Sequence, residues 1–297
     1  MSINRNRKQR KISNRPLSRR AFIKGSVGLA TAATAGGGLI RPASAQSGFG
    51  EYIPYDSTKD YHWDYNPNTR RREIIEHHHP GMEPTGEKFT FVRLKYAGGD
   101  WYTNLVRTYL WQSDLKFTQL LAANTAINVD LRQHPQYVEI DDPWLFSYPF
   151  LFMTGHGKVS GGMRITDKQV SKLREYFDRG GFMHVEDCDI REYNFRPQLI
   201  QLMKRIFPDK KFERLDMTHP IYHTLYPHNE YMGGDKLIPR FDFDEAIFDK
   251  DDKVMVYFCP SDLNCAWEGR PCRPGGEEQR IWAFEQGMNV VAYALTR

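Results

Sequence analysis

The chain has 297 residues, of which 40% are hydrophobic, 13% aromatic and 26% charged, a composition typical of globular proteins. Its formal net charge of +4 is misleading, because residues 1–45 contain ten Lys or Arg and no acidic residue. The rest of the chain has 31 basic and 37 acidic side chains, a net charge of −6, which argues against nucleic acid as a partner.

Residues 1–45 have the pattern of a twin-arginine signal peptide. Arg19 and Arg20 lie in the sequence SRRAFIK, and a weakly apolar, uncharged stretch follows at 25–40. This stretch is too short and too rich in Gly, Ala and Thr to anchor the chain in a bilayer. Cleavage is expected after the small residues ASA at 43–45. We therefore expect a periplasmic protein, exported by the twin-arginine route, with no stable membrane anchor after signal cleavage.

Two regions follow the signal peptide. Residues 46–88 are rich in Tyr, Pro, Asn and charge, and we expect them to form an irregular arm. Residues 89–297 alternate between strand and helix patterns and predict one α/β domain. The predicted strands occupy 89–96, 127–131, 136–140, 146–154, 182–187, 211–215 and 253–260. The predicted helices occupy parts of 101–124 and the segments 165–181, 195–208 and 280–296.

The segment 165–181 carries the clearest helix signals. Thr166 and Gln169 have the spacing of a capping box at the amino end of a helix. Gly180 provides a helix stop. The apolar residues of the segment recur at helical spacing and should face the core: Val170, Leu173, Tyr176 and Phe177. The alternation of such helices with strands predicts a three-layer sandwich whose mainly parallel sheet is covered on both faces.

Three of the predicted strands end in polar, sharply turning segments. The first ends in GGDW, which contains Asp100 and Trp101, and the second in TGHG, which contains Gly155, His156 and Gly157. The third ends in EDCD, at 186–189. Because open parallel sheets bind ligands beyond the carboxyl ends of their strands, these ends predict a common ligand-binding or active site. The alternative is structural, since such residues also bond to backbone or cap helices.

The segments GGDW, GHG, GGFMHVEDC, THPIYH (218–223) and GMNVVAYALTR (287–297) occur in an order that resembles the bacterial domain-of-unknown-function family DUF4159. The resemblance covers residues 88–297. It implies a flavodoxin-like sandwich similar to that of class I glutamine amidotransferases. Members of the family are often exported. The resemblance implies a fold and gives little chemistry, because the activity of the family is not established.

Cys188 occupies the place where an amidotransferase-like enzyme would have its nucleophile. Such enzymes use a G-x-C-x-G turn, whereas Cys188 has no adjacent glycine and is flanked by Glu186, Asp187 and Asp189. Nearby carboxylates disfavour a thiolate, so this sequence argues against nucleophilic catalysis. The alternatives are a buried small hydrophobe or a disulfide partner of Cys259.

The carboxylates Glu186 and Asp187 are the strongest acidic candidates of the site. Successive strand residues point to opposite faces, so these two carboxylates are not expected to enter the same pocket. His156 could act as a general base or as a ligand. A metal held by His156, Asp187 and Asp100 would have mixed nitrogen and oxygen ligands, which transition metals accept, but the spacing gives this arrangement no independent support.

The loop after the 253–260 strand adds two further candidates. Trp267 could line a ligand cleft or pack in the core. Cys265 and Cys272 flank a six-residue loop, and a disulfide between them would staple it in an oxidising compartment.

Three functional hypotheses follow from the sequence. The first is a non-enzymatic module that binds a small ligand or another periplasmic protein. The second is a hydrolase that uses His156 with Asp187, Cys188 or a bound metal. The third is metal carriage. The sequence requires no cofactor, although it permits a metal.

Overall fold

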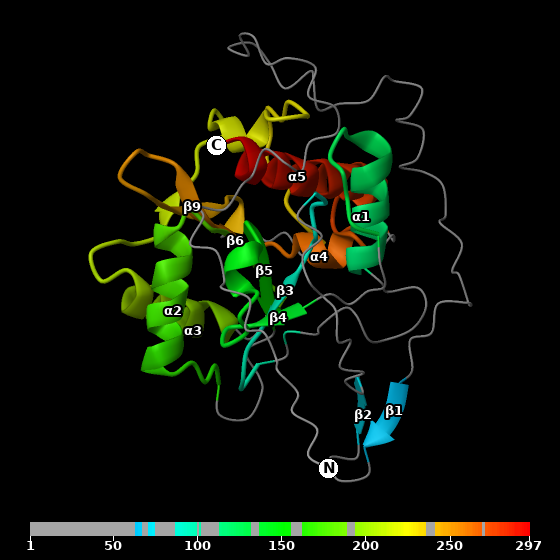
Figure 1. Ribbon diagram of the computed structural model, residues 1–297. Coiled ribbons are helices and arrows are strands. Elements are labelled where there is room, and N and C mark those ends of the chain that lie inside the picture. Colours follow the sequence, from blue (N-terminus) through cyan, green and yellow to red (C-terminus); the bar gives the residue numbers. More distant parts are fainter. Residues whose placement is uncertain are drawn as a thin grey trace, which may run out of the picture.

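The computed structural model (Figure 1) describes residues 63–66, 71–74, 87–99, 101, 113–131, 137–155, 162–188, 194–235, 241–268 and 271–297. No helix among these residues has the length and apolar character that crossing a membrane requires.

Seven strands form the main sheet, in the order β4-β3-β5-β6-β9-β8-β7. The five strands from β4 to β9 are mutually parallel, and β8 is antiparallel to both of its neighbours. The strand bounds are β3 (Arg93–Lys95), β4 (Tyr137–Glu139), β5 (Phe150–Gly155), β6 (Phe182–Asp187), β7 (Glu213–Arg214), β8 (Glu245–Phe248) and β9 (Val254–Cys259). The predicted mainly parallel sheet is therefore confirmed.

Helices cover both faces of the sheet (Figure 1). The helix bounds are α1 (Ser113–Asn124), α2 (Asp167–Asp178), α3 (Phe195–Ile206), α4 (Leu263–Ala266) and α5 (Gly276–Thr296), with short 3-10 turns at Leu145–Ser147 and Pro220–Tyr222. One apolar core lies between the sheet and the group α1, α4 and α5, and a second lies between the sheet and the pair α2 and α3. Alternate residues of β5 supply the two cores: Phe150 and Phe152 face the first, Leu151 and Met153 the second.

The helix predicted at 165–181 forms as α2, with the expected cap. The Gln169 amide donates to Thr166 Oγ1 at 3.3 Å, and the Thr166 amide donates to Gln169 Oε1 at 3.0 Å. All four predicted core residues of this helix are buried. Gly180 has a φ of +87°, the left-handed conformation that a helix stop requires.

β8 was not predicted from the sequence. This strand is four residues long and pairs with β9 through a tight turn, in which Asp249 accepts from the backbone amides of Asp251 and Lys253. Four residues that include the charged Glu245 carry too little apolar alternation to indicate a strand.

The expectation that 46–88 is wholly irregular is wrong for eight residues. β1 (Trp63–Asn66) and β2 (Arg71–Ile74) pair as a two-stranded antiparallel sheet. The register pairs Trp63 with Ile74 and Asn66 with Arg71.

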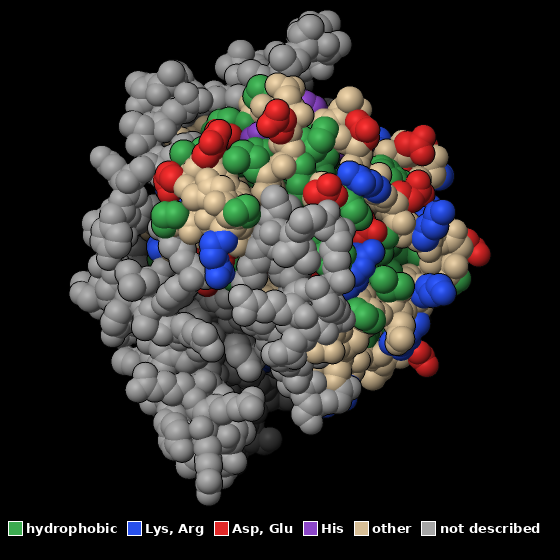
Figure 2. Space-filling view, turned by 180° about the vertical axis from the view of Figure 1, so that it is seen from behind, with side chains coloured by type: hydrophobic (Ala, Val, Ile, Leu, Met, Phe, Trp, Pro, Cys, Tyr) green, Lys and Arg blue, Asp and Glu red, His purple; other side chains and the backbone are tan. Residues whose placement is uncertain are grey.

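Charge of both signs is spread over the described part of the surface in Figure 2, which views the molecule from behind. Lys and Arg side chains there lie among Asp and Glu side chains, with hydrophobic side chains between them.

Candidate functional site

The carboxyl ends of the parallel strands lie side by side, as the sequence analysis expected. β3, β5 and β6 are consecutive in the sheet, and Gly155 at the end of β5 pairs with Asp187 at the end of β6. Glu186 pairs with Cys259 of β9. Three of the candidate residues, Asp100, His156 and Gly157, lie outside the described residues.

The turn after β3 is fixed by a buried ion pair. Arg93 of β3 donates from Nε and Nη2 to the two carboxylate oxygens of Asp114 in α1, both at 2.7 Å. Its Nη1 donates to the backbone carbonyl of Trp101 at 2.8 Å. These three bonds fix the orientation of the guanidinium. Arg93 therefore holds Trp101, the last residue of the GGDW segment, in place.

The segment after β3 is also fastened to β5 and to the segment 162–164. The Tyr96 hydroxyl donates to the carbonyl of Thr154 in β5 at 2.8 Å, and the Arg164 amide donates to the Ala97 carbonyl at 2.8 Å. Gly98 has a φ of +78°, and a Cβ built on it would lie 1.8 Å from the Gly162 carbonyl oxygen. Only glycine allows the two segments to approach this closely.

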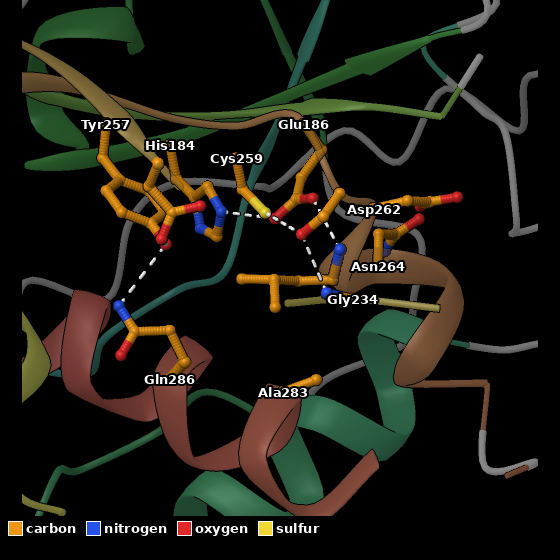
Figure 3. A network of polar contacts seen from close by, with 12 residues as sticks. His184, Glu186, Gly234, Tyr257, Cys259, Asp262, Asn264, Ala283 and Gln286 are labelled. Atoms are coloured by element: carbon orange, nitrogen blue, oxygen red, sulfur yellow. Dashed lines mark hydrogen bonds and ion pairs between the residues drawn. The ribbon is translucent and has the colours of Figure 1, made fainter. Parts of the chain in front are cut away.

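Glu186 does not face the edge of the sheet. Its carboxyl group lies beneath the sheet, on the side of α4 and α5, with Oε1 2.5 Å from His184 Nε2 and Oε2 accepting from the Leu263 amide at 2.8 Å (Figure 3). Burial raises the pKa of Glu186, with the Asp262 and Asp244 charges adding to the shift, and lowers the pKa of His184 to about 3. Burial therefore disfavours the charged form of both side chains.

This position corrects one expectation. Glu186 was a candidate ligand-binding residue, whereas in the structure it is fully buried and fastens the start of α4 to β6. Asp187 points to the opposite face, as strand alternation predicts, and it is also buried.

Of the two alternatives given for Trp267, the structure agrees with core packing. Trp267 has no exposed surface, stacks on Phe117 with ring centroids 4.2 Å apart, and donates from Nε1 to the Ala283 carbonyl at 3.0 Å. The loop is held against α1 and α5 by this apolar side chain, which sequence alone could not distinguish from a surface aromatic. Trp101 is likewise buried, with its ring against Tyr137.

The cysteines correct a second expectation. No disulfide joins any of the four, and Cys265 does not pair with Cys272. α4 directs Cys265 toward β6, where its sulfur lies 3.7 Å from the sulfur of Cys188. Cys272 instead sits in backbone pairing with Gly276. Cys259 forms no disulfide with Cys188 either, and its sulfur contacts Ser261 Oγ at 3.2 Å.

Asp262 completes a compact group with the two cysteines. It follows β9, has a left-handed backbone (φ 66°, ψ 63°) and accepts from the Cys265 amide at 3.1 Å. One ligand atom each of Cys188, Asp262 and Cys265 lies within 4.8 Å of the others, and all three residues are buried. Two thiols and a carboxylate in this arrangement can bind a metal ion.

A second buried polar group lies beside β9. The Asp244 carboxylate accepts from the hydroxyls of Tyr222, Tyr231 and Tyr257, at 2.9, 2.8 and 2.6 Å. Burial raises the pKa of Asp244 to about 6, although the three hydroxyls favour its charged form. The Tyr231 hydroxyl also contacts Ser261 Oγ, which accepts from the Gly234 amide, so this network joins the 231–235 loop to the end of β9.

The described residues also form a surface hollow, which lies away from these groups. Its walls come from the segment after α3 and from the β8–β9 turn, at the amino edge of the parallel strands, and include Lys210, Lys211, His219, Asp249 and Asp252. Its position opposite the carboxyl edge makes it a weaker candidate for a site.

The comparisons with known proteins add one finding. A family model for the domain of unknown function DUF4159 matches residues 90–295. The chain belongs to this family. The match runs from the segment before β3 into the last turn of α5, so the sheet and both helical layers lie within the DUF4159 domain. A comparison with curated proteins finds no match.

The sequence analysis overlooked several polar residues of the DUF4159 domain that the fold brings together, among them His184, Asp244 and Asp262. Two features of the sequence could have indicated these residues. His184 and Glu186 are two apart in an otherwise apolar strand, which places them on one face. The segment PSD follows the 253–260 strand and therefore reaches the same edge as EDCD, yet it was read only as a loop.

Proposed function

We propose that this protein is an exported module that binds a small ligand or a partner protein at the carboxyl edge of its sheet, between the turns after β3 and β5. The strand order is the observation that carries the proposal. Numbered by their order in the chain, the five parallel strands run 2-1-3-4-5 across the sheet, which is the flavodoxin-like order. This order supports the amidotransferase-like, flavodoxin-like class that the family resemblance implied.

The strand order also indicates where the ligand binds. In a sheet of this order, successive strands are added to one side of the first strand and then to the other. This switch point lies between the first and third strands, here β3 and β5, and ligands bind in the crevice beside it. The local structure suits such a role. Gly98 and Gly155 bring backbone to the edge, and the bonds of Arg93 and Tyr96 hold the turn after β3 in place.

Burial of Cys188 favours binding over hydrolysis by this cysteine. Its side chain is 2% exposed, and its thiol lies among acidic groups, since its charge contributes to the raised pKa of Glu186. A nucleophilic cysteine requires access and a positive surrounding that favours thiolate. A hydrolase built on His156 and Asp187 remains the alternative that the experiment below separates from binding.

Export by the twin-arginine route belongs to the same proposal. The paired Arg19 and Arg20, the mild apolar stretch and the small-residue cleavage sequence support it. The negative charge of the chain after residue 45 and the interspersed charges of Figure 2 favour a partner other than nucleic acid.

The test uses the full protein purified from the periplasm. Native mass spectrometry should detect a non-covalently bound molecule or partner on the wild-type protein. In parallel, a panel of amide and ester substrates should show no turnover. Turnover that is lost in His156→Ala or Cys188→Ser, without a co-purifying ligand, would support the hydrolase and overturn the proposal.

A further inference from the structure

Cys188, Asp262 and Cys265 come from two neighbouring strand ends and meet in the interior. Cys188 directly follows β6, whereas Asp262 and Cys265 lie in the turn after β9 and in α4. Because β6 and β9 are parallel and adjacent, the fold delivers these three residues to one place. The exposed fractions of the two cysteines are 2% and 4%, and that of Asp262 is zero.

We propose that Cys188, Cys265 and Asp262 bind one divalent transition-metal ion of the zinc class. The distance between the two sulfurs is the first argument. A disulfide would require about 2.0 Å between them. Two sulfurs bonded at about 2.3 Å to one tetrahedral zinc ion lie about 3.8 Å apart. The observed separation of 3.7 Å matches the second arrangement.

The carboxylate provides the second argument. A ligand atom of Asp262 lies within 4.8 Å of both sulfurs, close enough for one ion to contact all three. Zinc accepts thiolate and carboxylate ligands in the same site. The Asp262 carboxylate also accepts from the Cys265 amide at 3.1 Å, which holds it beside the two sulfurs.

The backbone around Asp262 holds it in a conformation that few side chains adopt. Its left-handed φ of 66° is uncommon for a residue other than glycine, and such conformations concentrate at functional sites. The neighbouring loop maintains it, since the Asp235 amide donates to the Asp262 carbonyl at 3.1 Å. A Cβ on Gly234 would lie 2.2 Å from that same carbonyl oxygen, so the loop can approach only because residue 234 is glycine.

An ion pair lies close to the three proposed ligands. Arg273 donates to the Asp235 carboxylate at 2.9 Å. The pKa of Arg273 is raised first by this bond and by the Asp235 charge, and also by Cys265 and Asp262. Two thiolates and one carboxylate carry three negative charges, of which a divalent ion would offset two.

Three protein ligands leave one position of a tetrahedral ion for water or another small ligand. The proposal is independent of the binding function proposed above, because it concerns the β6–β9 junction and not the turns after β3 and β5. It also differs from the metal site considered from sequence, since its ligands are Cys188, Asp262 and Cys265 and not Asp100, His156 and Asp187.

The test is a titration of the full, reduced protein with Co²⁺, followed by displacement with Zn²⁺. We expect one ion per chain and a thiolate-to-cobalt charge-transfer band in the near ultraviolet, which Zn²⁺ abolishes. Cys188→Ser and Cys265→Ser should each weaken binding at least tenfold. Cys272→Ser removes another buried cysteine and serves as the matched control, which should bind as the wild type does.

Two results would overturn the proposal. One is the absence of a charge-transfer band in wild-type protein whose four thiols are shown to be reduced. The other is a Cys188–Cys265 disulfide in protein isolated from the periplasm, seen as a mass two hydrogens lower and mapped by proteolysis. Asp262→Asn removes the carboxylate ligand and keeps both cysteines. It therefore distinguishes weaker metal binding caused by a missing ligand from weaker binding caused by unfolding. It should retain the circular dichroism spectrum of the wild type and weaken Co²⁺ binding.

Discussion

Arg93 and Asp114 form a two-bond ion pair that is buried between β3 and α1, with both nitrogen–oxygen distances at 2.7 Å. Asp114→Asn would leave the buried guanidinium without its countercharge, and we expect it to lower the free energy of unfolding by about 3–5 kcal/mol. Chemical denaturation of the two proteins measures this loss.

The double variant Arg93→Met, Asp114→Leu is the control for this pair. It removes both charges and fills similar volume, so most of the lost stability should return. A single Asp114→Asn variant as stable as the wild type would show that the pair does not hold α1 against the sheet.

Asp244 should make stability depend on pH. Burial raises its pKa to about 6, above the ordinary 3.8, so the folded protein binds this proton more tightly than the unfolded chain does. Its contribution is therefore fully present at low pH and is lost as the pH rises through about 6, a loss of about 3 kcal/mol. The free energy of unfolding, measured between about pH 4 and pH 8, should show this fall.

Asp244→Asn cannot ionise and should lack this component of the pH dependence. The substitution also changes the three hydrogen bonds to tyrosine, so the stability at a single pH does not isolate the effect of ionisation. The quantity to compare is the slope of the free energy of unfolding against pH. Equal slopes in the two proteins would mean that Asp244 is already ionised in the folded state at low pH.

Gly287→Ala tests the packing of α5 against Trp267. Alanine is the better helix former by about 1 kcal/mol, which on its own would stabilise α5. A Cβ at 287, however, would lie 2.6 Å from both the Phe117 and Trp267 rings. We expect overpacking to prevail and to lower the melting temperature, with a net loss of about 1–2 kcal/mol. A higher melting temperature would show that the stacked pair can move apart.

Export can be tested in the signal sequence. Replacing Arg19 and Arg20 by lysine keeps the charge and should leave uncleaved precursor in the cytoplasm, because the twin-arginine route reads the arginine pair. Arg5→Lys with Arg7→Lys is the matched control and should be exported normally. Fractionation and immunoblotting distinguish the two. Normal cleavage of both double variants would point to a general secretory signal.

Much of the fold could be predicted from sequence, because the strong signals are local. The capping box of Thr166 and Gln169 and the apolar stripe after it define α2, and the apolar runs that became β5, β6 and β9 identify the middle of the sheet. β8 was not predicted because its own sequence has no clear strand pattern, and its extended conformation depends on pairing with β9.

The site was harder to predict, because burial depends on the whole fold. Glu186 and Trp267 were plausible edge residues by position, yet one bonds to the start of α4 and the other stacks on Phe117. The nearness of Cys188 to Cys265, 77 residues apart, follows from the adjacency of β6 and β9, which no local pattern reveals.

The central claim is that a ligand binds between the turns after β3 and β5, and one pair of variants tests it most directly. Gly98→Ala and Gly276→Ala place the same methyl group on a left-handed backbone, but only the first collides, with the Gly162 carbonyl between these turns, whereas the second meets open space. Native mass spectrometry of the periplasmic protein should show the bound species on the wild type and on Gly276→Ala, and should show it lost from Gly98→Ala. Equal retention by the two variants, or no bound species on the wild type, would contradict the account.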